Sequence, residues 1–126
     1  MIDLYPKICN LCGGEVEYIP NSQIYGKSYG SGWCYHCKNC NAYVGTHKPR
    51  PKEALGILSN KEMKSWKMSC HNMFDDLWKN QGYKRQNCYK WLAKEMRINI
   101  NDCHFGYFDM KQLKMAYAIL KNKRPN

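Results

Sequence analysis

The sequence lacks long hydrophobic runs. Its longest uninterrupted apolar stretch, from Met115 to Leu120, contains six residues, whereas a transmembrane helix needs about 20. The first twelve residues include Asp3 and Pro6 and no apolar segment, so they do not have the pattern of a secretory signal. We therefore expect a soluble cytoplasmic protein without a membrane partner.

Acidic residues are also scarce. The 126 residues include 10 Asp and Glu against 20 Lys and Arg, which gives a net charge of +10. Residues 1–58 contribute +2 of this charge and residues 59–126 contribute +8. An excess of this size favours an anionic partner, and most of it lies in the second half of the chain.

The short motifs that mark common catalytic sites are missing as well. The sequence has no H-E-x-x-H motif, no nucleophile elbow and no phosphate-binding loop. These absences exclude the corresponding enzyme classes, and we expect a protein that is not an enzyme.

Cysteine, by contrast, is abundant, with eight residues. In a reducing cytoplasm these cysteines are not expected to form disulfides. Four of them form two C-x-x-C pairs, Cys9 with Cys12 and Cys37 with Cys40, separated by 24 residues. This spacing is typical of zinc sites in which each pair supplies two thiolates. Four thiolates leave no position for water, so we predict one Zn²⁺ with a structural role.

The surrounding residues suit this ligand set but leave an alternative open. Gly13 and Asn41 follow the second cysteine of each pair, and both tolerate the positive φ that such turns often require. Cys34 also forms a C-x-x-C pair with Cys37, so Cys34 or His36 is the alternative fourth ligand. Three isolated cysteines are expected to be small buried side chains: Cys70, Cys88 and Cys103.

Turn residues and apolar spacing predict the fold class. Residues 1–58 are punctuated by glycine, with strand-like patterns at 15–19 and 33–35, and the two prolines in 47–53 predict a linker. Apolar spacings of three and four predict helices, with capping boxes at two of their starts. The first predicted helix begins at the capping box 59–62 and continues to residue 82. The second covers about 84–97, and the third begins at 109.

These elements predict an α+β protein. We expect a small N-terminal zinc ribbon of short antiparallel strands, packed on a C-terminal bundle of about three helices. The ribbon and its linker cover residues 1–58 and the basic helical segment covers 59–126, and together they are expected to form one compact unit.

Several separated motifs carry a family resemblance. They are C-x-x-C-G, C-x-x-C-x-A-Y-V-G-x-H, H-x-x-F-D-x-L-W, Y-x-W-L-A and C-H-F-G, in this order along the chain. The set resembles a zinc-finger-containing domain family that is common in bacteriophages and prophages. The chain departs from the family pattern in the extra Cys34 and in Arg97, which stands where a turn glycine is usual.

The resemblance implies a zinc ribbon joined to a helical part, and it implies no particular activity. If a phage encodes the protein, the host cytoplasm is its expected location. The zinc ligands that the resemblance implies are Cys9, Cys12, Cys37 and Cys40.

Four polar residues inside these motifs form a second candidate site. His71 and Asp75 lie one turn apart on a predicted helix, so their side chains can meet. His47 comes from the linker and His104 from the last loop. We expect structural hydrogen bonds from these residues, and the alternatives are a second metal site or the general base of a nuclease.

Candidate nucleic-acid contacts lie in both segments. Three predicted helices carry rows of cations at helical spacing, which places each row on one face. The row of the third helix is Lys111, Lys114 and Lys121. A glycine-rich loop and the linker add aromatic and basic residues, a mixture suited to base stacking and backbone contact. The candidates are Tyr25, Lys27, Lys48, Arg50, Lys61, Lys64, Lys67, Lys90, Lys94 and Arg97.

The sequence therefore predicts a phage-type zinc-ribbon protein that binds nucleic acid through a basic surface. One alternative is a phage protein-interaction module that inhibits a host or defence protein that handles nucleic acid. A second alternative is a metal-dependent nuclease that uses His71, Asp75 and His104.

Overall fold

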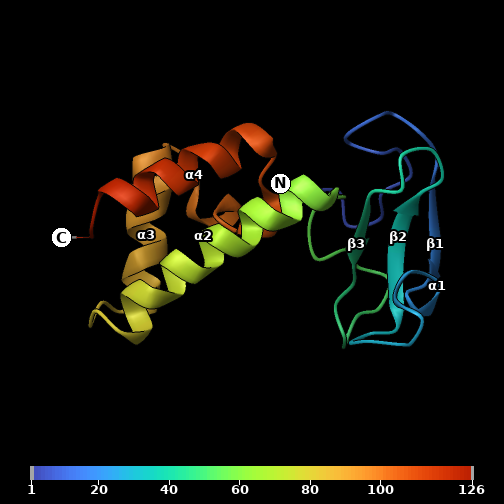
Figure 1. Cartoon of the computed structure of the whole chain (residues 1–126), viewed down its shortest axis with the longest axis horizontal. Helices are drawn as coiled ribbons and strands as arrows, with labels where there is room; N and C mark the ends of the chain where they lie inside the picture. Colours follow the sequence, from blue (N-terminus) through green and yellow to red (C-terminus); the bar gives the residue numbers. More distant parts are fainter. Residues whose placement is uncertain (1, 126) are drawn as a thin grey trace. The chain divides into compact units, whose positions relative to one another are not determined.

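The computed structural model describes residues 2–125 (Figure 1). It has a three-stranded sheet followed by helices, which confirms the predicted α+β class. The chain divides into two compact units, Ile2–Lys61 and a second unit from Glu62 onward. The elements in order are β1 (Val16–Pro20), α1 (Ser22–Tyr25), β2 (Trp33–Cys37), β3 (Tyr43–Gly45), α2 (Lys61–Lys79), α3 (Arg85–Met96), the 3₁₀ turns η1 (Ile100–Asp102) and η2 (Phe105–Tyr107), and α4 (Met110–Asn122).

The sheet of the first unit is antiparallel, with strand order β1-β2-β3. Tyr18 pairs with Tyr35, and Val16 pairs with Cys37. Because side chains alternate between the faces of a strand, Tyr35 and Cys37 share one face, where they join Cys9 and other buried residues in a small core. A core of this size stabilises a domain only marginally by burial, so the first unit depends on a further cross-link.

The segment predicted to be a linker is a closed loop of the first unit instead. Thr46 forms a bridge with Ala54, and the backbone of residues 47–53 is linked by internal hydrogen bonds. The Tyr18 hydroxyl donates to the Pro51 carbonyl at 2.5 Å, and the Tyr35 hydroxyl donates to the Lys52 carbonyl at 2.6 Å. The prolines do block regular structure, but these two long-range hydrogen bonds fasten the loop to the sheet.

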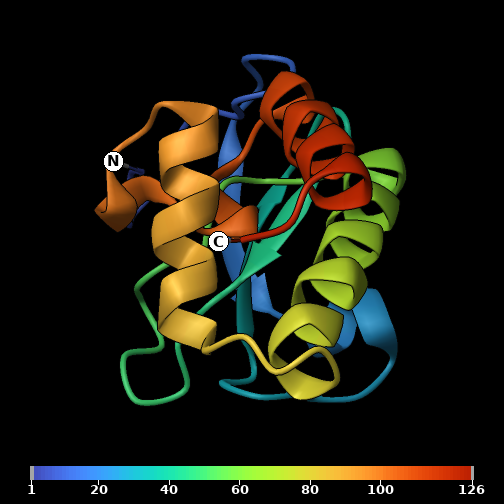
Figure 2. The same ribbon diagram turned by 90° about the vertical axis from the view of Figure 1, so that its left-hand side faces the viewer.

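The second unit contains α2, α3 and α4 (Figures 1 and 2). Apolar residues at helical spacing are buried, as the sequence predicts. The capping box at the start of α4 is present, with Asp109 accepting from the Gln112 N–H at 2.9 Å and Gln112 accepting in return at 3.1 Å. Among the described residues, every helix is too short or too polar to cross a membrane.

α3 ends in a left-handed residue that is not glycine. Arg97 has φ 59° and ψ 44°, and its N–H donates to the Lys94 carbonyl at 3.1 Å. The next residue, Ile98, donates to the Ala93 carbonyl at 3.0 Å. These bonds close the helix end as a glycine C-cap would, so Arg97 carries the backbone strain that glycine would avoid.

Candidate zinc centre and basic surfaces

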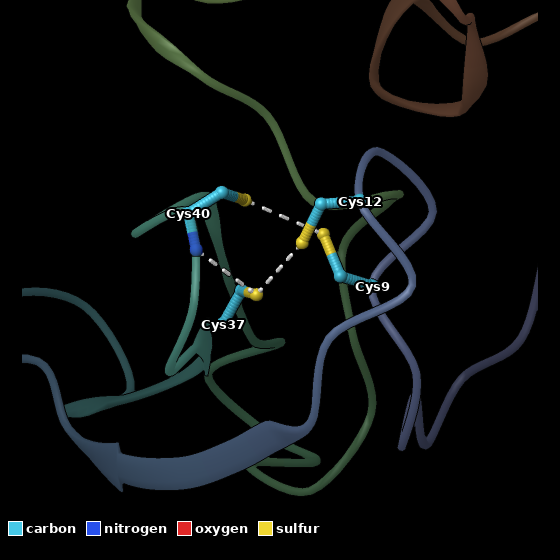
Figure 3. Close-up of side chains that lie close together, drawn as sticks. All are labelled: Cys9, Cys12, Cys37 and Cys40. Atoms are coloured by element: carbon cyan, nitrogen blue, oxygen red, sulfur yellow. Dashed lines mark hydrogen bonds between the residues drawn. The ribbon is translucent and has the colours of Figure 1, made fainter.

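Two turns of the first unit bring the four predicted zinc ligands to one point (Figure 3). All four Sγ atoms lie within 4.8 Å of one another. The Sγ atoms of Cys9 and Cys40 are 3.7 Å apart, and those of Cys12 and Cys37 are 3.5 Å apart. A tetrahedral Zn²⁺ with Zn–S bonds of about 2.3 Å separates its sulfurs by about 3.8 Å. The spacing of the four cysteines therefore fits one structural Zn²⁺.

The two turns have the same local fold. In each turn the first cysteine exchanges backbone hydrogen bonds of 2.8–3.1 Å with the residues four and five positions later. The residue after the second cysteine is left-handed in both, with φ 75° at one and 66° at the other. The residues concerned are Gly13 and Gly14 for Cys9, and Asn41 and Ala42 for Cys37.

Backbone and side-chain N–H groups point at the sulfurs. The Gly14 N–H and the Asn39 amide donate to the Cys12 Sγ at 3.3 and 3.4 Å. The Leu11 N–H donates to Cys9 at 3.3 Å, and the Cys40 N–H donates to Cys37 at 3.4 Å. Such donors stabilise a thiolate over a thiol, which is the form that binds zinc.

Gly14 fits where a side chain would not. A Cβ at this position would lie 2.8 Å from the Asn39 Cβ and 3.1 and 3.2 Å from the sulfurs of Cys37 and Cys12. Gly14 does not have a positive φ, so space rather than backbone conformation requires glycine here. The close approach of the backbone to the sulfurs is part of the site.

The thiols differ in acidity. The pKa of Cys12 is lowered to about 6, first by the hydrogen bond from the Asn39 amide and then by the Gly14 N–H. For Cys40, the hydrogen bond from the Ala42 N–H lowers the pKa, but burial and the neighbouring thiols outweigh it and raise the pKa to about 12. Four adjacent thiolates repel one another, and a bound cation offsets that repulsion.

The alternative fourth ligands do not reach the cluster. Cys34 and Cys37 are three residues apart on β2, so their side chains point to opposite faces of the sheet. The His36 Nδ1 lies 2.7 Å from the Glu17 carboxylate, and its Nε2 lies 3.1 Å from the Asn41 Oδ1. His36 therefore supports the second turn from outside rather than binding the metal.

The three isolated cysteines are fully buried in the second unit. Burial raises the pKa of Cys70 and Cys103 to about 11, and the Cys70 thiol donates to the Leu113 carbonyl at 3.5 Å. These thiols are inert packing groups.

The residues of the predicted histidine and acid cluster pack against aromatic rings or accept structural hydrogen bonds. The His71 ring packs edge-on against Phe105, with ring centroids 4.7 Å apart, and burial lowers the pKa of His71. The Asp75 carboxylate accepts from the Trp78 indole at 3.1 Å. His104 packs on Tyr107 at 4.6 Å. Within residues 2–125, the four zinc-site cysteines are the one group of three or more His, Cys, Asp or Glu placed to bind a metal.

His47, the fourth member of the predicted cluster, lies in the first unit. Its N–H donates to the Glu53 carbonyl at 3.0 Å, and its carbonyl accepts from the Arg50 N–H at 3.2 Å. The backbone of His47 thus closes the loop, and the geometry assigns no chemistry to its ring.

The candidate nucleic-acid contacts of the first unit lie in two segments, at the end of α1 and in the closed loop. Tyr25 is 47% exposed, and its ring packs edge-on against Tyr29 and Tyr43 at 5.2 and 5.7 Å. The Lys27 ammonium lies 5.3 Å above the Tyr29 ring. Lys48 and Arg50 are exposed in the closed loop, where Arg50 pairs with Glu53.

The cations of α3 are better placed for a ligand. Lys90, Lys94 and Arg97 are all exposed, and none of them forms an ion pair within the described part of the chain. Lys61, at the start of α2, is exposed as well. These four residues present positive charge directly to solvent.

The other two cations of the α2 row are half-buried. The ammonium nitrogen of Lys64 is buried. The pKa of Lys67 is lowered to about 8, first by burial and then by the charge of Lys64. The row predicted from spacing is thus unequal in exposure, and Lys61 is its most exposed member.

A cleft of about 500 Å³ in the second unit was missed by sequence reasoning. The sequence pattern that marks it is Arg85 with Tyr89 one helical turn later and Lys90 beside it. The cleft depends on η1 folding beside α3, which no local pattern reveals. Its lining residues are Arg85, Gln86, Tyr89, Lys90, Ile100, Asn101, Cys103 and His104.

Comparison with known proteins matches the chain to one family model. The model, described as a zinc-finger-containing domain, matches residues 5–123. Neither a curated protein nor a solved structure matches the chain.

Proposed function

The chain belongs to the zinc-finger-containing domain family, and from this premise we propose that it binds nucleic acid through the basic face of its helical unit. In this proposal the zinc is structural and the protein is not an enzyme. A phage origin, which the sequence resemblance implies, is part of the same proposal.

The observation that carries the proposal is the set of exposed cations on α3. Lys90, Lys94 and Arg97 lie at spacings of four and three on the helix or at its end, so they share one face. They lie in the half of the chain that has 14 Lys and Arg against six Asp and Glu. Exposed cations without acidic partners are suited to displace the counterions of a phosphate backbone.

The zinc centre supports the proposal indirectly. With four cysteine ligands the coordination sphere is closed, so the metal offers no position for a substrate. Zn²⁺ supplies the cross-link that the small core of the first unit requires. The nuclease alternative needs a metal bound near His71, Asp75 and His104, and the described residues bring no such group together.

The proposal is tested by removing charge from one face at a time. The triple variant Lys90→Gln, Lys94→Gln and Arg97→Gln removes three cations from α3. The matched control removes three exposed lysines from α4 and thus has the same net charge: Lys111→Gln, Lys114→Gln and Lys121→Gln. Mobility-shift titrations at about 50 mM salt compare both variants with the unmodified protein.

We expect the α3 variant to lose affinity by about 10- to 1,000-fold, since each lost phosphate contact weakens binding to all sequences. The α4 control should lose far less. Equal losses in the two variants would mean that net charge alone attracts nucleic acid and would reject α3 as the interface.

A protein-interaction module is the second candidate function. Ile8 is 71% exposed, Tyr5 52% and Leu11 41%, all near the first zinc turn. Large apolar side chains that are this exposed favour a protein partner where they form a patch. In a pull-down from host lysate, a stoichiometric protein that remains after nuclease treatment would favour this function, and its loss with nuclease would favour nucleic-acid binding.

A further inference from the structure

The cleft in the second unit has the size and lining of a ligand site. Its volume of about 500 Å³ lies within the range of small-molecule pockets, about 300–1,000 Å³. One wall is the N-terminal half of α3, which contributes Arg85, Tyr89 and Lys90. The other wall is η1 and the residues after it. All lining residues belong to one compact unit.

Two cations in the cleft suit a phosphate group. The Arg85 guanidinium lies over the rings of Tyr89 and Trp78, with centroid distances of 4.9 and 5.7 Å, and donates to the Tyr89 hydroxyl at 3.1 Å. These contacts hold the planar donor in place before a ligand arrives. Neither Arg85 nor Lys90 has an ion-pair partner among residues 2–125, and the lining includes no carboxylate.

The rest of the lining suits a nucleobase. The Tyr89 ring is already covered by Arg85 at 4.9 Å and by Phe74 at 4.5 Å. The surfaces open to a base are the exposed His104 ring, whose centroid lies 6.3 Å from that of Tyr89, and Ile100, which exposes 43% of its surface. Aromatic and apolar surfaces of this kind stack on bases. Gln86 and Asn101 add side-chain amides, each of which both donates and accepts hydrogen bonds, as the edge of a base requires.

We propose that this cleft binds one unstacked nucleotide of a single strand, with the base against His104 and Ile100 and the phosphate against Arg85 and Lys90. The inference deepens the proposed function and rests on it, because it assigns single-stranded nucleic acid as the ligand class. A base inside a duplex is stacked and paired, so it would have to leave the helix before it could enter the cleft.

The test uses the full zinc-bound protein and defined probes. Isothermal titration measures binding of uridine 5′-monophosphate, uridine and inorganic phosphate, and fluorescence anisotropy measures an eight-nucleotide single strand and a duplex of the same length. The cleft variants are Lys90→Gln and Ile100→Asp. The control, Lys111→Gln, removes the same charge as Lys90→Gln from an exposed position on α4 outside the cleft. Thermal melts establish that all variants fold.

We expect the nucleotide to bind more tightly than uridine or phosphate, and the single strand more tightly than the duplex. Both cleft variants should weaken nucleotide and single-strand binding about tenfold, because a stacked base and its phosphate contact are lost, while the control stays within about twofold. Unchanged single-strand binding in both cleft variants would overturn the inference and leave the proposed function standing. Nucleotide binding no tighter than phosphate would also overturn it, and no binding of either oligonucleotide would reject both.

Discussion

At the scale of single residues, the zinc centre depends on details that spacing does not reveal. The C-x-x-C pattern identifies four ligands, but the structure adds the donors and the space around them. Asn39 donates to the Cys12 sulfur, and His36 links Glu17 to Asn41 in the second turn. Gly14 lies so close to two sulfurs that no side chain fits.

Replacing Gly14 with alanine should weaken zinc binding, because the new Cβ would displace Asn39 or the sulfurs. Gly45→Ala is the matched control, since its Cβ would lie at an ordinary 3.5 Å from Leu55. Competition with a chromophoric chelator measures the affinity. We expect Gly14→Ala to lose about tenfold or more, as changes beside metal ligands do, and Gly45→Ala to stay close to the unmodified protein. Equal affinities for all three proteins would show that the space at Gly14 does not matter.

Lys67 should make stability depend on pH. Its pKa in the folded state is lowered to about 8, chiefly by burial, so the unfolded chain holds this proton more tightly. Protonated Lys67 therefore destabilises the fold below pH 8, and the penalty fades as the pH rises toward the ordinary lysine pKa of about 10.4. Lys67→Met should raise the urea midpoint at pH 7 and raise it much less at pH 10. The same gain at both values would mean that the charge of Lys67 is not the cause.

At the scale of elements, local pattern predicts most of the secondary structure. The apolar residues of α2, α3 and α4 recur at helical spacing, and the capping box of α4 is formed as predicted. The closed loop at 46–54 was not predicted, because hydroxyls of Tyr18 and Tyr35 from distant strands hold it. The short α1 and the 3₁₀ turns have no strong local pattern, and the cleft that η1 lines was missed for the same reason.

The end of α3 gives a prediction at this scale. Arg97 is left-handed, which costs a residue other than glycine about 1 kcal/mol. Arg97→Gly should thus raise the free energy of unfolding by about 1 kcal/mol, while weakening nucleic-acid binding. Lys94→Gly, inside the same helix, should lower it by about 1 kcal/mol. Urea unfolding of both variants measures the difference, and a loss of stability in Arg97→Gly would contradict the assigned strain.

At the scale of the whole molecule, the two units differ in what stabilises them. The second unit buries large side chains from three helices, including Phe74, Leu92 and Leu113. The core of the first unit has only two large buried side chains, Tyr35 and Leu58, beside alanines and zinc-site cysteines. The ligand set was predictable because each pair is local in sequence, whereas the opposite orientation of Cys34 on β2 became clear only with the sheet.

Loss of zinc should unfold the first unit. Zinc binding contributes on the order of 10 kcal/mol in such modules, far more than a small core does. After chelation, or in Cys9→Ser, hydrogen exchange should show amides of residues 2–61 losing protection, while those of α2, α3 and α4 keep most of theirs. Cys88→Ser is the control, because this buried cysteine lies outside the zinc centre. Full protection of residues 2–61 after complete chelation would contradict a structural role for zinc.

The central claim of nucleic-acid binding is tested most directly by the salt dependence of affinity. Each phosphate contact steepens the slope of log K against log[salt] by about 0.7 for single strands and 0.9 for duplex DNA. With contacts from Arg85, Lys90, Lys94 and Arg97, we predict a straight line with a slope of about −3 to −4. A flat line, or no binding at about 50 mM salt, would contradict the account.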